Sequence, residues 1–380
     1  MEKSDSHTNS HRFAVLDAWR GVAAVTVAAS RLHVDTAVFL SPLIRNSYLF
    51  VDFFFVLSGF VIAFAYGEKI INGAAALRFM LRRMGRLWPL HISLLGIFVA
   101  SELARWVLNK PDTFTGTRGP ITVMADITLT QALGFFDVTL WNTPAWSIST
   151  EFWAYAVFAL ILTLGRKYSA WIAGFMIATG LLVVANYSST GMDVTFRLGF
   201  ARCLAGFFTG VLVHTCWVAT RQRMQSFMGS GLEILVLVAC GGFVWLAGRS
   251  EFSLLAPALF APMVYVFAFE AGVVSRLMQA KGFQALGTWS YGIYMTAFAL
   301  EQLFSGVIKH LEPMLRIELA RETHMGTGYM RLIDLPWWGA NTALTLAYLA
   351  SVVLVSALSW RWLETPSRNW FNQQANKLSK

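Results

Sequence analysis

Long apolar stretches recur along nearly the whole chain, and they constrain the fold more than any other feature. A helix needs roughly 20 mostly apolar residues to cross the ~30 Å hydrocarbon core of a bilayer. Such stretches follow one another from residue 13 to residue 362, and 56% of all residues are apolar while only 13% are charged. The sequence therefore predicts an all-α, polytopic integral membrane bundle without a separate soluble domain.

About ten transmembrane helices are expected, one for each apolar stretch. They are 13–33, 47–66, 87–108, 146–165, 170–187, 198–219, 231–248, 254–271, 286–308 and 338–361. The chain then divides into a short cytoplasmic N-terminal segment, 1–12, one transmembrane domain, 13–362, and a cytoplasmic tail, 363–380.

The basic residues between these stretches predict the orientation through the positive-inside rule. With the N-terminus inside, the inside segments carry 17 Lys and Arg residues and the outside segments nine, mostly in two long loops, 109–145 and 309–337. Both termini are therefore expected in the cytoplasm. The segment 121–136 is half apolar, which is typical of a re-entrant or interfacial helix. The net charge of +9 comes from short connectors and not from one basic face, which argues against nucleic-acid binding.

The three cysteines give no sign of a metal or disulfide site. Cys203, Cys216 and Cys240 lie in apolar stretches without CxxC spacing or a nearby His partner. They are expected to be small buried hydrophobic residues.

Charged residues within a span are costly in lipid, so they mark candidate sites. Arg20 and Arg31 are eleven residues apart in the first span, which places them within about 20° of one face of a continuous helix. Such a stripe would suit an anionic ligand. Asp17 precedes Arg20 by three residues, so an ion pair within the helix is the structural alternative. Two further arginines, Arg105 and Arg202, also fall within spans.

The second span carries polar residues at its outer end and near its middle. Asp52 lies at the outer end, where it is either functional or merely interfacial. Ser58 can bond a carbonyl or a ligand, and Gly59 allows a neighbouring backbone to approach closely. Simple helix packing would also explain the Ser-Gly pair.

Two further features point to a site that binds an anion and moves a proton. Arg83 and Arg86 share a helical face where the third span leaves the cytoplasm, which favours bidentate capture of phosphate groups. Ordinary positive-inside anchoring is the alternative. Glu151 opens the fourth span and is followed by apolar residues, so it is a candidate catalytic group unless it only pairs with an intramembrane arginine.

Together these motifs resemble the acyltransferase 3 family, whose members O-acylate lipopolysaccharides, exopolysaccharides, nodulation factors and related glycans. The resemblance rests on six segments in the family's order: Leu16–Gly21, Val51–Ile62, Arg82–Pro89, Pro144–Glu151, Leu286–Tyr294, which contains Tyr291, and Trp362–Arg368. It implies a bundle of about ten helices in the bacterial inner membrane. It also implies that acyl-coenzyme A enters from the cytoplasm, with transfer to a sugar hydroxyl at or beyond the outer face.

The sequence departs from the family's pattern at two positions. The resemblance implies a His at position 31, proposed as a base, and a second His at position 297, where this chain has Arg31 and Ala297. Arginine cannot act as a general base because its pKa stays above about 12. His33 lies about 200° around the helix, so it could replace the missing base only if the helix ends or unwinds there.

The expected function is therefore a membrane-bound O-acyltransferase that moves an acyl group, acetyl in the first instance, from acyl-coenzyme A to a glycan or glycolipid hydroxyl. Glu151 is the expected base, with Arg20 or Arg31 holding phosphate, the thioester oxygen or the glycan. The polysaccharide-synthesis machinery is an expected partner, and no metal is expected. The alternative is a non-catalytic carrier of an acyl donor or solute, since both family histidines are absent. An ion-coupled transporter is a third reading, with only faint support from Gly241-Gly242, Pro257 and Pro262.

Overall fold

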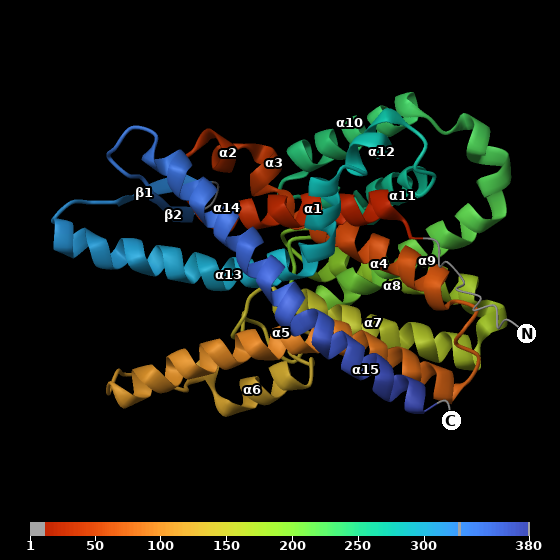
Figure 1. Ribbon diagram of the computed structural model, residues 1–380, viewed down its shortest axis with the longest axis horizontal. Coiled ribbons are helices and arrows are strands. Elements are labelled where there is room, and N and C mark those ends of the chain that lie inside the picture. The colour runs from red at the N-terminus through yellow and green to blue at the C-terminus, as the bar shows by residue number, and fades with distance from the viewer. Residues whose placement is uncertain (1–11, 326–327, 379–380) are drawn as a thin grey trace, which may run out of the picture.

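Helices form most of the chain in the computed structural model, which describes residues 12–325 and 328–378. The helices with more than ten residues are α1 (Ala14–Ala29), α4 (Phe50–Tyr66), α5 (Gly73–Val107), α7 (Ala145–Leu164), α8 (Ser169–Tyr187), α9 (Gly199–Met224), α10 (Ser230–Ala247), α11 (Ala256–Phe267), α13 (Lys281–Leu315), α14 (Ala340–Ser359) and α15 (Thr365–Lys377). They pack into an elongated bundle, and α1 begins at the same end of it as α15 finishes (Figure 1).

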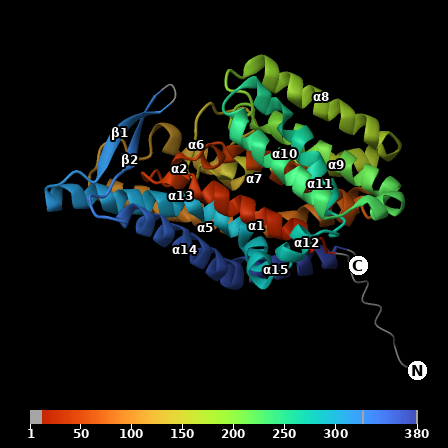
Figure 2. The ribbon, with the colours of Figure 1, turned by 90° about the horizontal axis from the view of Figure 1, so that it is seen from above.

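Shorter elements connect these helices. The short α-helices are α2 (Ala37–Leu40), α3 (Pro42–Arg45), α6 (Pro120–Ile127) and α12 (Val273–Met278). The 3-10 turns are Ser47–Leu49, Gly116–Arg118, Arg166–Tyr168, Gln225–Phe227 and Glu251–Leu255, and a π-helical turn, Trp360–Glu364, joins α14 to α15. Strands β1 (Ala320–Met325) and β2 (Gly328–Ile333) form an antiparallel hairpin. The hairpin lies at one end of the bundle, beside α13 and α14 (Figure 2).

Each of the ten expected spans overlaps one helix, and within the described residues seven helical stretches are both long and apolar enough to cross a bilayer. They are Ser47–Tyr66, Gly73–Val107, Ala145–Leu164, Arg166–Tyr187, Gly199–Phe227, Ser230–Ala247 and Ala340–Lys377. Helices α1 and α11 are shorter, with 16 and 12 residues, and the 35-residue α13 is not apolar enough. The membrane-embedded helical fold is thus supported, while the number of ten spans stays a prediction.

The first helix is shorter than expected, which corrects the proposed arginine stripe. Helix α1 ends at Ala29, and Ser30 closes it by donating its hydroxyl hydrogen bond to the Val27 carbonyl. The chain beyond it pairs with the hairpin: the Ile333 amide donates to the His33 carbonyl at 2.8 Å, and the Asp35 amide donates to the Ile333 carbonyl at 2.8 Å. Backbone pairing to a distant strand therefore ends the helix before position 31.

Other boundaries also differ from the expected ones. Helix α5 begins at Gly73, well before residue 87, because the Asn72 side chain caps it by accepting from the Ala75 amide. The expected outer loop 309–337 contains the end of α13 and the hairpin, and the expected tail 363–380 is largely α15. In the segment 121–136 the helix is only α6, which ends at Ile127.

Close contacts between backbones hold the centre of the bundle together. A Cβ atom added at Gly59 on α4 would lie 1.8 Å from the Phe207 carbonyl oxygen of α9, and one at Gly210 would lie 1.9 Å from the Val56 oxygen. Helices α1 and α13 approach each other in the same way at Gly21 and Gly287. Small residues allow this proximity, so the Gly59 prediction is confirmed.

Candidate active site

A cavity lies between α1, α4, α5, α7 and α13, and it contains about 780 Å³ of empty space, including its opening. Its polar lining residues are Arg20, Ser58, Arg83, Arg86, Ser147, Glu151, Tyr155, Ser290, Tyr291 and Tyr294. Apolar side chains such as Phe54, Phe55 and Leu57 form the rest of the wall. Five of the six segments that carry the family resemblance thus contribute to one site.

The cavity is extended along α4. Val51 and Ile62 both line it, and eleven residues of α-helix span about 16 Å. Arg83 and Arg86 lie in the first half of α5, and α5 begins close to the point where α4 ends. Val51 lies at the other end of α4, near its first residue. The two arginines and Val51 thus lie toward opposite ends of the cavity.

Glu151 on α7 is the carboxylate of this cavity. Its Oε1 accepts a hydrogen bond from Ser58 Oγ at 2.5 Å and another from the hydroxyl of Tyr155, one helical turn further along. The Ser58 and Tyr155 oxygens are 2.9 Å apart. Among the described residues no Lys, Arg or His lies within 4.0 Å of this carboxylate. The alternative in which Glu151 only pairs with an intramembrane arginine is therefore not observed.

Arg20 reaches the cavity from α1 and is held by α13. Its Nε donates to Ser290 Oγ at 2.8 Å, and its Nη2 donates to the Gly287 carbonyl at 3.2 Å. Asp17 is 3.3 Å from Nη2, so the ion pair expected within this helix is present. Asp17 also accepts from Arg12 at 2.8 Å, and it does not line the cavity. Arg20 thus pairs with Asp17 and also lines the cavity.

Arg83 and Arg86 both line the cavity, as their shared helical face predicts. Arg83 donates from Nη2 to the Tyr66 hydroxyl at 3.0 Å and lies over the Tyr66 ring, 5.1 Å from its centroid. Its buried Nε has no hydrogen-bond partner within the described chain. Arg86 likewise makes no hydrogen bond or ion pair to any described residue. Unsatisfied guanidinium donors in a cavity can bind a phosphate or another anion.

Tyr291 lies in the cavity wall, on α13. Its hydroxyl donates a hydrogen bond to the Leu87 carbonyl of α5. This bond joins the helix that carries Ser290 to the helix that carries Arg86. Tyr291 thus helps to fix the two sides of the cavity relative to each other.

Asp52 lies outside the cavity, in a fully buried ion pair with Arg202 of α9. Arg202 donates from Nε to Oδ1 at 2.9 Å and from Nη2 to Oδ2 at 2.7 Å. Its remaining donors reach the carbonyls of Val194 and Tyr48 at 3.1 and 2.9 Å. Asp52 is thus engaged in helix packing, and it does not contact the cavity.

Arg31 and His33 also lie outside the cavity lining. Both follow the end of α1, so the unwinding that a catalytic His33 requires does occur. The His33 ring packs against Phe39 at a centroid distance of 5.2 Å, and its backbone pairs with Ile333. The structure therefore joins Arg20, Arg83, Arg86, Ser58, Glu151 and Tyr291, but not Arg31 or His33.

Four polar residues that line the cavity were not expected from the sequence: Ser147, Tyr155, Ser290 and Tyr294. Tyr155 could have been found, since it follows Glu151 by four residues and must lie on the same helical face. Ser290 and Tyr294 belong to the late Ser-Tyr motif, but their contacts involve other helices: Tyr294 accepts from Ser147 Oγ at 3.1 Å. A pattern within one helix does not indicate such pairings.

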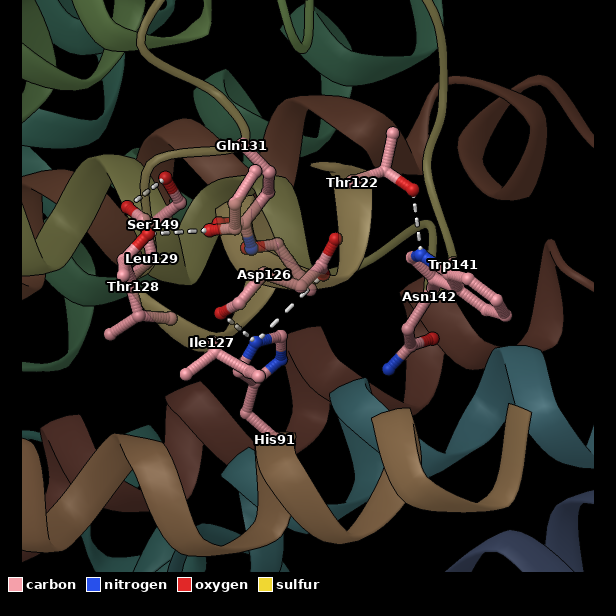
Figure 3. A network of polar contacts seen from close by, with 12 residues as sticks. His91, Thr122, Asp126, Ile127, Thr128, Leu129, Gln131, Trp141, Asn142 and Ser149 are labelled. Atoms are coloured by element: carbon pink, nitrogen blue, oxygen red, sulfur yellow. Dashed lines mark hydrogen bonds and ion pairs between the residues drawn. The ribbon is translucent and has the colours of Figure 1, made fainter. Parts of the chain in front are cut away.

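A second buried polar network lies in the segment 109–145 and joins α5, α6 and the start of α7 (Figure 3). His91 Nε2 is 2.8 Å from the Asp126 carbonyl oxygen and 3.8 Å from its carboxyl Oδ1. Asp126 is 1% exposed and its Oδ2 has no partner within the described chain. Burial raises the pKa of Asp126 to about 8, so at pH 7 the carboxyl is neutral and the contact with His91 is polar and not an ion pair.

This network fixes the loop segment to the bundle and does not open into the cavity. Trp141 Nε1 donates to Thr122 Oγ1 at 2.9 Å, and Ser149 Oγ donates to the Leu129 carbonyl at 2.7 Å (Figure 3). Asn142 Nδ2 reaches the Met295 carbonyl of α13 at 3.4 Å. The loop is thus tied to α7 and α13 close to Ser147 and Tyr294.

Comparison with known proteins places the chain in a family. The family model described as an acyltransferase domain matches residues 13–361. Acyltransferase MdmB of Streptomyces mycarofaciens is 25% identical over 83% of this chain and 79% of its own length. Protein 2 in picA locus of Rhizobium radiobacter is 34% identical over 40% of this chain and 84% of its own length. No solved structure matches the chain. Because the family model covers almost the whole sequence, the chain belongs to the acyltransferase 3 family.

Proposed function

We propose that this membrane protein is an O-acyltransferase that moves an acyl group, acetyl in the first instance, from acyl-coenzyme A to a hydroxyl of a cell-surface or secreted polysaccharide or glycolipid. The cell location is the bacterial inner membrane, with both termini in the cytoplasm. Family membership supports the reaction class. The arrangement of the cavity supports the donor and the direction of transfer.

The observation that carries the proposal is a single cavity that contains a carboxylate and three arginines. Acyl transfer to an alcohol requires removal of the hydroxyl proton and stabilisation of the oxyanion that develops on the carbonyl. Glu151 is the group that can accept the proton, and no described residue hydrogen-bonds its Oε2. Arg20, held by Ser290 and Gly287, supplies a fixed positive charge in the same space.

Arg83 and Arg86 fit the phosphate groups of the donor. The buried Nε of Arg83 lacks a partner, and Arg86 is unpaired among the described residues. Bidentate guanidinium contacts are the strong way to hold phosphate oxygens. The positive-inside rule places this end of α5 in the cytoplasm, where acyl-coenzyme A is available.

The acceptor would enter from the opposite end of the cavity, near Val51. The space runs about 16 Å along α4, so the thioester and the hydroxyl can reach Glu151 from different sides of the membrane. Apolar walls at Phe54 and Phe55 keep bulk water away from the reacting atoms.

The test is transfer of radiolabel from acetyl-coenzyme A to glycan by the protein purified in lipid nanodiscs. We expect labelled O-acetyl product with the wild type and a loss of about 10²–10⁴-fold with Glu151→Gln, the range for a general base. Glu251→Gln, an exposed residue outside the cavity, is the control and should keep wild-type activity. If labelled donor binds the wild type but no glycan or glycolipid is ever acylated, the protein is a carrier and the proposal is wrong.

A further inference from the structure

Ser58 differs from most other hydroxyl residues within the helices. The hydroxyl of a Ser or Thr within a helix can donate a hydrogen bond to the backbone carbonyl four residues earlier. Ten residues within the described helices do so at 2.6–3.1 Å: Thr26, Ser93, Thr209, Thr215, Thr220, Thr288, Thr296, Thr345, Ser351 and Ser356. Ser58 makes no such bond in the described structure and instead contacts Glu151 and Tyr155.

The contact with Glu151 is the one that activates a serine. A serine hydroxyl is a weak nucleophile unless a base lies within hydrogen-bond reach. Ser58 Oγ is 2.5 Å from Glu151 Oε1, and the Tyr155 hydroxyl, which donates to the same oxygen, orients the carboxylate. Ser58, Glu151 and Tyr155 thus have the arrangement of a nucleophile, a base and a group that orients the base.

The surroundings of Ser58 suit a covalent intermediate. Ser58 lines the cavity together with Arg20 and Arg83, whose charges can stabilise an oxyanion there. The neighbouring wall is apolar at Phe55, Leu57 and Val61, which would protect an ester from water. The close approach of α4 and α9 at the next residue, Gly59, fixes the backbone of the serine.

We propose that Ser58 is an acyl-accepting nucleophile and that transfer proceeds through an acyl-Ser58 ester, a step that rests on the function proposed above. Ser58 Oγ attacks the thioester carbonyl carbon, so the Oγ–C bond forms and the C–S bond breaks. Glu151 takes the serine proton and passes it to the leaving thiolate.

In the second half, the carboxylate of Glu151 takes the proton of the acceptor hydroxyl, whose oxygen attacks the ester carbon. The new C–O bond forms, the C–Oγ bond breaks, and the proton returns to Ser58. Donor and acceptor then never need to occupy the extended cavity at the same time. The same base serves both halves, so no histidine is required at position 31.

The experiment exposes the purified protein in nanodiscs to acetyl-coenzyme A without acceptor and maps acetyl groups by peptide mass spectrometry. The wild type should carry one acetyl group on Ser58 and release an equivalent amount of coenzyme A. Ser58→Ala should give no adduct and lose at least about 10³-fold in transfer, as removal of a catalytic nucleophile does. Ser58→Cys should give a thioester adduct that neutral hydroxylamine removes.

Two controls separate this step from its alternatives. Ser93→Ala removes an exposed serine that bonds back to its own helix, so adduct and activity should stay at the wild-type level. Tyr155→Phe should still acquire acetyl on Ser58, whereas an adduct at residue 155 of the wild type would overturn the assignment.

The outcomes also distinguish a failure of the acyl-Ser58 intermediate from a failure of the proposed O-acyltransferase function. Glycan acylation by Ser58→Ala at the wild-type rate, without a trapped adduct in the wild type, would show direct transfer and leave the proposed function intact. If the wild type neither forms an adduct nor acylates any acceptor while it binds acetyl-coenzyme A, both proposals fail.

Discussion

Arg202 on α9 donates a hydrogen bond to each carboxylate oxygen of Asp52 on α4, with Nε 2.9 Å from Oδ1 and Nη2 2.7 Å from Oδ2. The two residues are 1% and 0% exposed, and they are 150 positions apart in the chain. The arginine also lies over the rings of Tyr48 and Trp146, 5.6 and 5.4 Å from their centroids. The pair therefore fixes α4 against α9 on the helix that also carries Ser58.

Breaking this pair should destabilise the protein more than replacing it. Asp52→Leu leaves a buried guanidinium without its counter-charge, which costs about 3–5 kcal/mol, and Arg202→Met leaves the carboxylate unpaired at a similar cost. The double variant Asp52→Leu with Arg202→Met should recover part of the loss. Thermal unfolding in one detergent measures all three variants. Strictly additive losses would contradict a direct interaction between the two residues.

The contact between α4 and α9 predicts a strong effect of one added methyl group. Gly59→Ala should lower the melting temperature, because its Cβ would lie 1.8 Å from the Phe207 carbonyl oxygen and overpacking costs about 1–3 kcal/mol or more. Gly96→Ala is the matched control, since nothing lies within 4 Å of its added Cβ. The control should melt at or slightly above the wild-type temperature. Equal melting of both variants would mean that the two backbones are not in contact.

Arg86, which has no hydrogen-bond or ion-pair partner among the described residues, predicts a donor-binding defect when it is replaced. Arg86→Ala should raise the KM for acyl-coenzyme A by roughly 10- to 100-fold, because a hydrogen bond to a charged group contributes about 1.5–3 kcal/mol. Arg78→Ala, on the same helix but outside the cavity lining, should leave the KM unchanged. Initial rates over a range of donor concentrations provide the measurement. A similar rise for both variants would indicate general attraction by a basic surface.

The buried carboxyl of Asp126 predicts a pH dependence of stability. Its pKa is raised from the usual value to about 8 by burial, so the folded state holds a proton that the unfolded chain loses near pH 4. The protonated carboxyl therefore contributes to the free energy of unfolding. The contribution is fully present below about pH 4 and is lost progressively as the pH rises to about 8. Asp126→Asn cannot titrate, so its stability relative to the wild type should increase between pH 5 and pH 8. Unfolding curves in detergent at both pH values test this, and parallel behaviour of the two proteins would disprove it.

Several elements could be predicted from the sequence because they depend on one segment at a time. Every apolar stretch forms a helix, since a bilayer-length run of apolar residues leaves the backbone no other way to satisfy its hydrogen bonds. The shared face of Arg83 and Arg86, the Asp17–Arg20 pair and the small-residue contact at Gly59 follow from helical spacing and residue size. The cost of an acid in an apolar stretch was enough to single out Glu151.

Helix ends and partners across helices could not be predicted in this way. Helix α1 stops at Ala29 because the following backbone pairs with Ile333, about 300 residues away, which removes Arg31 from the face of Arg20. Asp52 and Ser58 lie on the same helix, yet one is neutralised by Arg202 while the other meets Glu151. Their spacing puts them about 120° apart on α4, but it does not indicate which of the two faces an arginine and which faces a carboxylate.

The sequence by itself determined that this chain is a helical membrane protein of the acyltransferase 3 family, with a carboxylate and several arginines in costly positions. Only the tertiary structure decided which charges face one another and which face a cavity. The physical reason is that hydropathy and helical spacing describe each helix separately. The bond between Ser58 and Glu151 depends on how close α4 and α7 approach and how each is rotated about its axis.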